Sequence, residues 1–334
     1  MQNSTKALED YSLKEAIFEF QELFFGFAPA TIIATAAKLG LFSHLKETAS
    51  AHQIAQKLNL SLRGTQRLLN ALKALRVLEE REGGFCISRE YVPLFNPDSP
   101  LYLGDIFSHA LRLQNNWMDL PEVVKRGSPL QRKKDPSFFA TLARGLFSTN
   151  WFVAVELAEQ FTPKPGKVLD VAGGSGVWSA ALLLKHPQLT ATVLDLPPVI
   201  QGAALPTVQR LNLTERYSFI EGDLFNTPWG EGYSTVILGH ICHSLGEEGV
   251  KEAMRLSKGA LAPNGRLVVV DFFREEGTTF PFIFSINMLV ATKEGNVYSK
   301  KEYSHFLAQT GFKVEGLIDL SSPRPSGAIV AIPS

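Results

Sequence analysis

Cysteine and net charge are the two features that this 334-residue chain has least of. Its two cysteines, Cys86 and Cys242, exclude a disulfide framework, so we expect a reducing, cytoplasmic setting. Lysine plus arginine number 33 and aspartate plus glutamate also number 33, which leaves no formal net charge. A neutral chain lacks the global attraction to phosphates that nucleic-acid binders and anionic-membrane binders carry. We therefore expect neither nucleic acid nor a membrane as a partner.

Long apolar runs and polar aromatic residues are also scarce. The N-terminus has no basic and apolar signal regions, and no later stretch reaches the roughly 18 uninterrupted apolar residues of a membrane span. There are 4 tryptophans and 7 tyrosines, against 23 phenylalanines. Because phenylalanine supplies a large apolar area with no polar tip to satisfy, this excess favours a dry core or an apolar pocket.

The pattern of apolar residues changes near residue 165. Before that point they recur at helical spacing, and after it short, wholly apolar strands alternate with helices. Such strands are typical of a parallel sheet covered by helices on both faces, and the strand, turn, strand ending predicts an antiparallel final pair. We expect a helical domain, linking helices that contribute to a substrate pocket, and an α/β domain, at residues 1–100, 101–164 and 165–334.

Residues 51–90 follow a winged-helix pattern of helix, turn, helix and hairpin, with Gly83-Gly84 as the hairpin turn. This module could recognise DNA or serve as a packing and dimerisation unit. The candidate recognition helix carries the polar residues Arg63, Gln66, Arg67 and Lys73. Its other face is nearly all leucine, and three glutamates follow it directly. The dimerisation interpretation is therefore favoured.

The strongest local signal is a glycine-rich turn between an apolar strand and a helix, at residues 168–184. Its small residues let the backbone approach a ligand at the carboxyl end of a strand, and they are Ala172, Gly173, Gly174 and Gly176. A phosphate-binding P-loop requires a lysine at the helix start, and none is present there. A dinucleotide fingerprint would use Ser179 as its third small residue, which is a weak match. A nucleoside without phosphates is the remaining candidate.

Two aspartates end the next two predicted strands. Asp195 follows ATVL, where a carboxylate can accept hydrogen bonds from both ribose hydroxyls, and Asp223 follows at IEGD, where a purine would lie. Such an acidic pair would repel a pyrophosphate but tolerate a cation. The alternative is that both aspartates cap the helices that follow.

Three segments together resemble the successive motifs of class I S-adenosylmethionine-dependent methyltransferases. They are Asp170-x-Ala172-Gly173-Gly174-Ser175-Gly176, Leu194-Asp195-Leu196-Pro197 and Gly222-Asp223-Leu224-Phe225. More narrowly, the chain resembles the plant-caffeate and hydroxyindole type of O-methyltransferase family, which includes bacterial enzymes for polyketides, carotenoids and bacteriochlorophyll precursors. The likeness covers nearly the whole chain. It implies a Rossmann-like seven-stranded sheet, an N-terminal, mostly helical winged-helix domain, and a homodimer.

The resemblance also assigns the binding of S-adenosylmethionine. It implies that the turn of Ala172, Gly173 and Gly174 contacts the methionine part of this cofactor. Asp195 with Leu196 would bind the ribose, and Asp223 with Leu224 the adenine. The expected set includes Gly239, where many family members carry a lysine instead.

Methyl transfer is an in-line displacement, and a hydroxyl nucleophile must also lose its proton. The family histidine that acts as general base falls on His243, although Ser244 and Leu245 replace the Asp-Trp that usually follows. The first of two acids that orient this histidine falls on Asp271. The second falls near Val297, where no acid is present.

Other roles for His243 stay open, namely a hydrogen bond that positions the substrate, or a helix cap. A metal site is not expected, because the spacing of His240, Cys242, His243 and Asp271 matches no common set of ligands.

The acceptor pocket is expected between the linking helices and the segment that follows the fifth strand. Suitable lining residues are Trp117, Phe147, Asn150, Trp151, Phe284, Asn287 and Met288. Any single one of these aromatics is more often a core residue. As a set they favour a small hydrophobic acceptor, aromatic or polycyclic. The helices at residues 22–42 are more apolar than a surface pair should be, which predicts pairing with a second subunit.

The predicted function is thus S-adenosylmethionine-dependent O-methylation of a small hydrophobic metabolite or pigment precursor. Two alternatives stay open. One is a C-methyltransferase or a relative that binds the cofactor without methylating. The other is a winged-helix regulator that senses a ligand through a degenerate methyltransferase domain.

Overall fold

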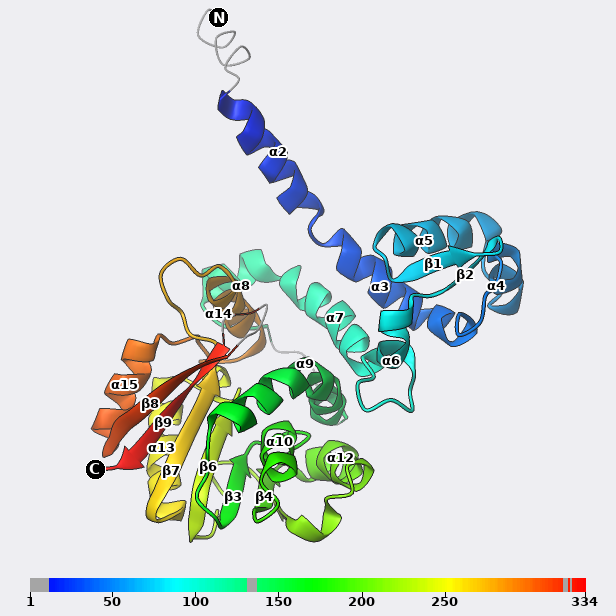
Figure 1. The fold of residues 1–334 in the computed structure, drawn as a ribbon. Helices are drawn as coiled ribbons and strands as arrows, with labels where there is room; N and C mark the ends of the chain where they lie inside the picture. The colour runs from blue at the N-terminus through cyan, green and yellow to red at the C-terminus, as the bar shows by residue number, and fades with distance from the viewer. Residues whose placement is uncertain (1–11, 131–136, 321–323, 325) are drawn as a thin grey trace, which may run out of the picture. The chain divides into compact units, whose positions relative to one another are not determined.

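The computed structural model describes residues 12–130, 137–320, 324 and 326–334. The chain divides into two compact units, Met1–Ser99 and Pro100–Ser334. Each unit has its own sheet, a two-stranded one in the first and a seven-stranded one in the second. Figure 1 shows the order of the elements along the chain.

The first unit is mainly helical. Its elements are α2 (Ser12–Phe25), α3 (Ala28–Lys38), η1 (Leu41–His44), α4 (Ala51–Lys57), α5 (Leu62–Ala74), β1 (Leu78–Arg81), β2 (Gly84–Ile87), η2 (Arg89–Tyr91) and α6 (Val92–Phe95). Ser50 and Gln53 form a capping box that starts α4, and the Ser61 hydroxyl accepts a hydrogen bond from Gly64 N that starts α5. The predicted helix, turn, helix and hairpin are all present.

The hairpin turn lies one residue earlier than predicted. Glu82 and Gly83 form it, with φ of 50° and 77°, and Arg81 pairs with Gly84 across the ladder. Gly84 is therefore a strand residue. A Cβ there would lie 2.7 Å from the Thr48 side chain, so the glycine is needed for close packing rather than for the turn.

Helix α2 exposes an unusual number of large apolar side chains. Phe20, Leu23 and Phe24 are 69%, 78% and 70% exposed. Helices α2 and α3 together form a 26-residue stretch, Leu13–Lys38, that is long and apolar enough to cross a membrane by length and composition. The search for uninterrupted apolar runs overlooks this stretch because charged residues such as Glu19 and Glu22 interrupt it. Such a surface needs a covering partner.

The second unit begins with three helices and continues as alternating strands and helices. The helices are α7 (Gly104–Trp117), α8 (Leu120–Arg126) and α9 (Phe138–Gln160). The remainder comprises β3 (Lys167–Val171), α10 (Val177–Lys185), β4 (Thr190–Asp195), α11 (Pro197–Val199), η3 (Ile200–Ala204), α12 (Leu205–Arg210), η4 (Thr214–Arg216), β5 (Tyr217–Glu221), β6 (Tyr233–Gly239), η5 (Cys242–Ser244), α13 (Glu247–Ala260), β7 (Leu261–Asp271), α14 (Phe280–Ala291), α15 (Lys300–Gln309), β8 (Phe312–Leu320) and β9 (Ser326–Pro333). Between β4 and β5, the π-helical turn η3 separates α11 from α12.

The large sheet has the strand order β5-β4-β3-β6-β7-β9-β8. Neighbours from β5 to β7 pair in parallel, whereas β9 pairs antiparallel with both β7 and β8. This confirms the predicted fold class and the inserted antiparallel strand. The turn predicted between β8 and β9 lies mostly outside the described residues.

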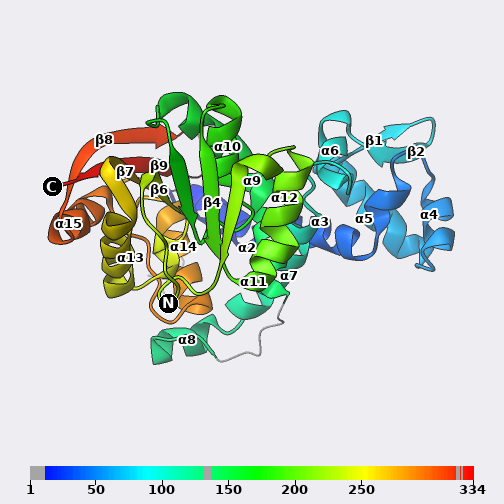
Figure 2. The same ribbon diagram turned by 90° about the horizontal axis from the view of Figure 1, so that it is seen from below.

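Helices cover both faces of this sheet, as the apolar strands require (Figures 1 and 2). On one face, Val168, Ile237 and Val268 pack against α9, α10 and α12. On the other face, Leu169 and Val236 pack against α13 and α15. Residues that follow the carboxyl ends of β3, β4, β6 and β7 are thereby gathered at one edge, where open α/β sheets bind ligands.

Candidate active site

The glycine-rich turn links β3 to α10 and requires small residues at several positions. Ala172, Gly174 and Gly176 have φ of 48°, 59° and 74°, in the left-handed region that favours glycine. A Cβ at Gly173 would lie 2.7 Å from the carboxyl carbon of Asp170. The backbone of the turn is therefore left open to a ligand that must approach closely.

Asp195 at the end of β4 is tied to this turn. Its Oδ2 accepts a hydrogen bond from Gly174 N at 2.8 Å, and its Oδ1 accepts one from Leu196 N at 2.7 Å. Burial raises the pKa of Asp195, and these two backbone bonds act in the opposite direction. Leu196 is the N-cap of α11 and no side chain caps that helix, so Asp195 does not act as a helix cap.

Asp223 is exposed in the turn that follows β5. Its Oδ1 accepts hydrogen bonds from Phe225 N at 3.0 Å and from Asn226 Nδ2 at 2.7 Å. This is a local turn contact rather than a helix cap. A tight glycine turn flanked by two aspartates, with no lysine in the loop, fits a cationic nucleoside such as S-adenosylmethionine better than a pyrophosphate.

Asp170 supports the turn from inside the sheet. Its Oδ2 accepts hydrogen bonds from Ser179 N at 3.1 Å and from Ser179 Oγ at 2.6 Å, while its buried Oδ1 has no partner among the described residues. Burial raises the pKa of Asp170 to about 7, although the bonds from Ser179 lower it. The folded state therefore retains a proton at this carboxyl up to a higher pH than the unfolded state.

We expect this group to make the stability of the protein depend on pH. Because the pKa of Asp170 is raised from 3.8 to about 7 on folding, its stabilising contribution is present below pH 4 and is lost as the pH rises through 7. Asp170→Asn should therefore gain stability relative to the wild type between pH 5 and pH 8, by about 1.4 kcal/mol for each pH unit below 7. Urea denaturation at the two pH values measures this change.

The exposed Asp98 supplies the control, since Asp98→Asn should show no such change. An Asp170→Asn difference that is the same at both pH values would contradict the assignment.

Gly239, at the end of β6, faces the indole of Trp178 in the first turn of α10. Any Cβ at position 239 would overlap that indole, and Trp178 is only 2% exposed. Trp178 thus occupies the space that a longer side chain at 239 would need, which is a physical reason for the departure from the family lysine. The sequence analysis missed Trp178, because nothing local connects the two positions.

His243 and Asp271 form a buried, closely hydrogen-bonded pair in the site. His243 lies in η5 just after β6, and Asp271 ends β7. His243 Nδ1 lies 2.6 Å from Asp271 Oδ1, and His243 N donates to Asp271 Oδ2 at 3.1 Å. Their side chains are 9% and 0% exposed. The parallel neighbours β6 and β7 bring the two residues together at their carboxyl ends.

The carboxylate of Asp271 accepts two further hydrogen bonds. Tyr303 in α15 donates its hydroxyl to Oδ2 at 2.8 Å, and Phe272 N donates to Oδ1 at 2.8 Å. Burial raises the pKa of Asp271, but the charge and hydrogen bond of His243 and the Tyr303 bond outweigh it and lower the pKa below its ordinary value. The sequence analysis missed Tyr303, although a tyrosine on the apolar face of a helix signals a buried partner for its hydroxyl.

Apolar groups surround the imidazole of His243. The ring of Phe284 meets it edge to face at 5.0 Å. Val297, which stands where a second acid was sought, is fully buried in a cluster with Phe272 and Met288. A Cβ at Gly295 would lie 2.6 Å from His243 O, so the segment before α15 packs closely behind the histidine.

The residues expected to line the acceptor pocket fall into two groups. Trp117 Nε1 in α7 donates to Asn287 Oδ1 in α14 at 3.1 Å, and Phe284 and Met288 on the same helix lie beside His243 and Phe272. On α9, by contrast, Phe147 is buried in the main core cluster and stacks on Trp151 at 5.2 Å. The half-buried Asn150 precedes Trp151 on that helix.

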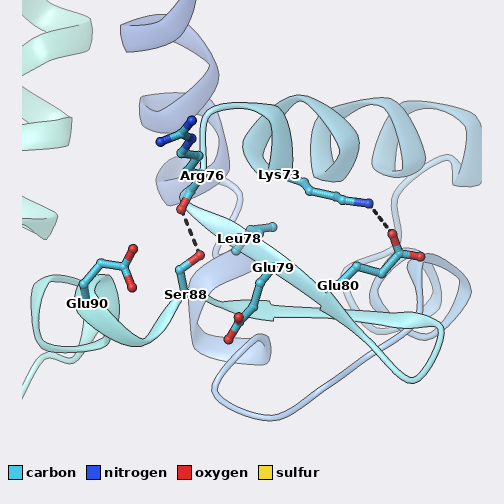
Figure 3. Close-up of a pocket in the computed structure, with 7 residues that line it drawn as sticks. All are labelled: Lys73, Arg76, Leu78, Glu79, Glu80, Ser88 and Glu90. Atoms are coloured by element: carbon cyan, nitrogen blue, oxygen red, sulfur yellow. Dashed lines mark hydrogen bonds and ion pairs between the residues drawn. The ribbon is translucent and has the colours of Figure 1, made fainter.

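A surface hollow lies in the first unit, between α5 and the hairpin (Figure 3). It is lined by Lys73, Arg76, Leu78, Glu79, Glu80, Ser88 and Glu90. Lys73, one of the candidate DNA-contacting residues, forms an ion pair with Glu80. This acidic lining does not favour a phosphate backbone as ligand.

Across the part of the chain that the structure describes, no three histidine, cysteine, aspartate or glutamate side chains are grouped as metal ligands.

Comparison with known proteins identifies the family. The model of the O-methyltransferase domain matches residues 112–313, and that of the O-methyltransferase dimerisation domain matches residues 21–92. The second match includes α3 and the last residues of α2.

Curated relatives match along most of their length. The 3-hydroxy-5-methyl-1-naphthoate 3-O-methyltransferase of Streptomyces sahachiroi is 27% identical over 314 residues, with 90% of each chain covered. The acetylserotonin O-methyltransferase of Gallus gallus is 28% identical over 340 residues, covering 91% of this chain and 94% of that protein.

Solved structures share the fold. Human N-acetylserotonin methyltransferase in complex with S-adenosylmethionine has a TM-score of 0.81 at 20% identity, covering 96% of this chain and 98% of that one. LaPhzM has a TM-score of 0.85 at 20% identity, with 96% and 99% covered. The resemblance found in the sequence is confirmed: this chain belongs to the O-methyltransferase family and is an S-adenosylmethionine-dependent methyltransferase with an N-terminal dimerisation domain.

Proposed function

We propose that the protein methylates a hydroxyl group of a small hydrophobic, aromatic or polycyclic metabolite, with His243 as the general base. The observation that carries this proposal is the buried hydrogen bond of 2.6 Å between His243 Nδ1 and Asp271 Oδ1. The names of relatives agree with such an acceptor, since they include a naphthoate 3-O-methyltransferase and a tetracenomycin polyketide 8-O-methyltransferase.

The pair defines which nitrogen of His243 does the chemistry. An ionised carboxylate only accepts hydrogen bonds, so Nδ1 carries a proton and Nε2 is left as the basic nitrogen. Nε2 takes the proton of the acceptor hydroxyl, and the charge of Asp271 faces the imidazolium that forms. S-adenosylmethionine, when bound, would supply a methyl group from its positively charged sulfur. After the transfer, that sulfur would be part of a neutral thioether.

We infer that the second acid, absent at Val297, is not needed to orient His243. Tyr303 and two backbone N–H groups hold the carboxylate of Asp271 in place, so the imidazole needs no second carboxylate to fix its orientation. Val297 instead forms part of the apolar wall behind the site.

For the cofactor, we assign the methionine part to the turn of Ala172, Gly173 and Gly174, which the positive φ angles leave open to close approach. Asp195 with Leu196 would hold the ribose, and Asp223 with Leu224 the adenine. For the acceptor, we assign Trp117, Phe284, Asn287 and Met288, which lie on the side of His243, and Phe147, Asn150 and Trp151 on α9.

A direct test is product analysis with methyl-labelled S-adenosylmethionine and naphthol acceptors. Transfer to oxygen gives a methoxy signal by NMR and supports the proposal. A methyl group on ring carbon would contradict it and would favour the second candidate, a C-methyltransferase. That candidate is supported by an L-tyrosine C(3)-methyltransferase of Streptomyces lavendulae, which is 24% identical over 337 residues.

We further propose that the exposed phenylalanines of α2 form the interface of a homodimer. Replacing Phe20 and Phe24 with aspartate should raise the dimer dissociation constant at least about 100-fold, since each buried phenylalanine contributes about 1.5–3 kcal/mol. Light scattering over a range of concentrations measures it, with Glu22→Lys as the control on the same helix. A wild-type protein that is monomeric at micromolar concentration would exclude the interface.

A further inference from the structure

His240 combines an unusual backbone with an unpaired ring nitrogen. Its φ of 55° lies in the left-handed region, which a histidine adopts only at a cost in free energy. Its backbone N–H donates to Val270 O at 2.9 Å, which fixes this conformation just beyond the end of β6. Its Nε2 is buried and has no hydrogen-bond partner among the described residues.

The ring of His240 lies between Trp178, in the first turn of α10, and the proposed base. It meets Trp178 edge to face at 5.0 Å, packs on Phe272 at 4.5 Å, and lies 6.0 Å from the ring of His243. Burial lowers the pKa of His240 to about 4, so the ring is neutral at pH 7 and can donate with one nitrogen and accept with the other.

Packing alone does not account for this histidine. An apolar side chain of similar size would fill the space between Trp178 and Phe272 without burying an unpaired nitrogen. Two unfavourable features at one residue, beside the reacting centre, are typical of a residue that serves a ligand. His240 as a whole is only partly buried, which leaves part of the residue accessible.

We propose that His240 determines acceptor specificity by hydrogen-bonding an oxygen that neighbours the one deprotonated by His243. The preferred acceptor therefore carries two adjacent oxygens on an aromatic system, as in a vicinal diol or a hydroxyl next to a carbonyl. With ring centroids 6.0 Å apart, the two imidazoles can each reach one oxygen of such a pair through a hydrogen bond of about 2.8 Å. This inference rests on the proposed function of the same site.

The test compares 2,3-dihydroxynaphthalene with 2-naphthol as acceptors. The wild type should show a kcat/KM at least about 10-fold higher for the diol. His240→Leu should reduce this ratio about 10-fold or more, because one hydrogen bond is lost. His240→Gln, whose amide nitrogen can replace Nε2, should restore part of the ratio. The control is His305→Leu, an exposed histidine on α15, which should leave the ratio unchanged.

Two further measurements separate a ligand contact from a structural role. The melting temperature of His240→Leu should equal or exceed that of the wild type, and its affinity for S-adenosylhomocysteine, measured by calorimetry, should be unchanged. Equal losses with both acceptors, a loss of S-adenosylhomocysteine affinity, or a wild type without preference would each overturn the proposal.

If the wild type methylates neither acceptor, the proposed function fails for these acceptors, and the role of His240 is then decided by binding. Calorimetry on protein saturated with S-adenosylhomocysteine should show tighter binding of the diol than of 2-naphthol, and His240→Leu should abolish that difference. Equal binding in the wild type would overturn the inference.

Discussion

Replacing His243 with alanine should lower kcat for methyl transfer to a hydroxyl by about 10²- to 10⁴-fold, the usual contribution of a positioned general base. The reason is that Nε2 is the nitrogen left to take the acceptor proton once Nδ1 is bonded to Asp271. Affinity for S-adenosylhomocysteine should stay within about 2-fold, because the cofactor turn and Asp195 are not altered. Steady-state kinetics and calorimetry measure the two quantities.

The pH dependence of the rate in His243 variants distinguishes a general base from a residue that only positions the substrate. In His243→Ala, the residual rate should rise with pH, since only an acceptor already ionised in solution can react. His243→Gln can keep a hydrogen bond to the acceptor but cannot take its proton, so a rate close to that of the wild type in this variant would show that His243 positions the substrate rather than acting as a base. Unchanged transfer in both variants would refute the mechanism.

Asp271→Asn should lower both kcat and the free energy of unfolding by a large amount. The carboxylate of Asp271 accepts four hydrogen bonds, from His243 Nδ1, His243 N, the Tyr303 hydroxyl and Phe272 N. In Asp271→Asn, the NH₂ group of the new side chain would face some of these donors and could not accept from them. If the amide nitrogen faces His243, the imidazole adopts the tautomer with a protonated Nε2, which cannot act as a base. We expect kcat to fall at least about 100-fold.

The free energy of unfolding should fall by about 3–5 kcal/mol in Asp271→Asn, because donors buried around the carboxylate lose their partner. The pKa of Asp271 is lowered in the folded state, so its contribution is present above its ordinary pKa and is lost only as the pH falls below it. The loss should therefore be nearly constant between pH 6 and pH 8. Urea denaturation at these pH values measures it.

Tyr303→Phe is the matched control for Asp271→Asn. It removes one donor from Asp271 and leaves the bond to His243, so we expect a loss of about 1–3 kcal/mol in stability and a much smaller loss in kcat. If Tyr303→Phe lowers kcat as much as Asp271→Asn, the carboxylate acts mainly by holding the fold, and the proposed role of Asp271 is wrong.

The strands and the site-bearing turns were predictable because their signals are local. Short apolar segments flanked by glycine or aspartate predicted the strands β3, β4 and β5. In a parallel sheet the carboxyl ends of neighbouring strands share one edge, and the family resemblance implied that Asp271 orients His243 there. The hairpin turn was misplaced by one residue, because Gly83 and Gly84 look alike in sequence and only the packing on Thr48 distinguishes them.

The sequence by itself determined the family and the fold class, and it predicted His243 and Asp271 as a pair. Only the tertiary structure decided what supports them. Tyr303 reaches Asp271 from 32 residues away, Trp117 reaches Asn287 from 170 residues away, and Trp178 takes the space beside Gly239. No periodicity or motif encodes such contacts, because they depend on how whole helices pack on the sheet, and a side chain's partner is set by that packing.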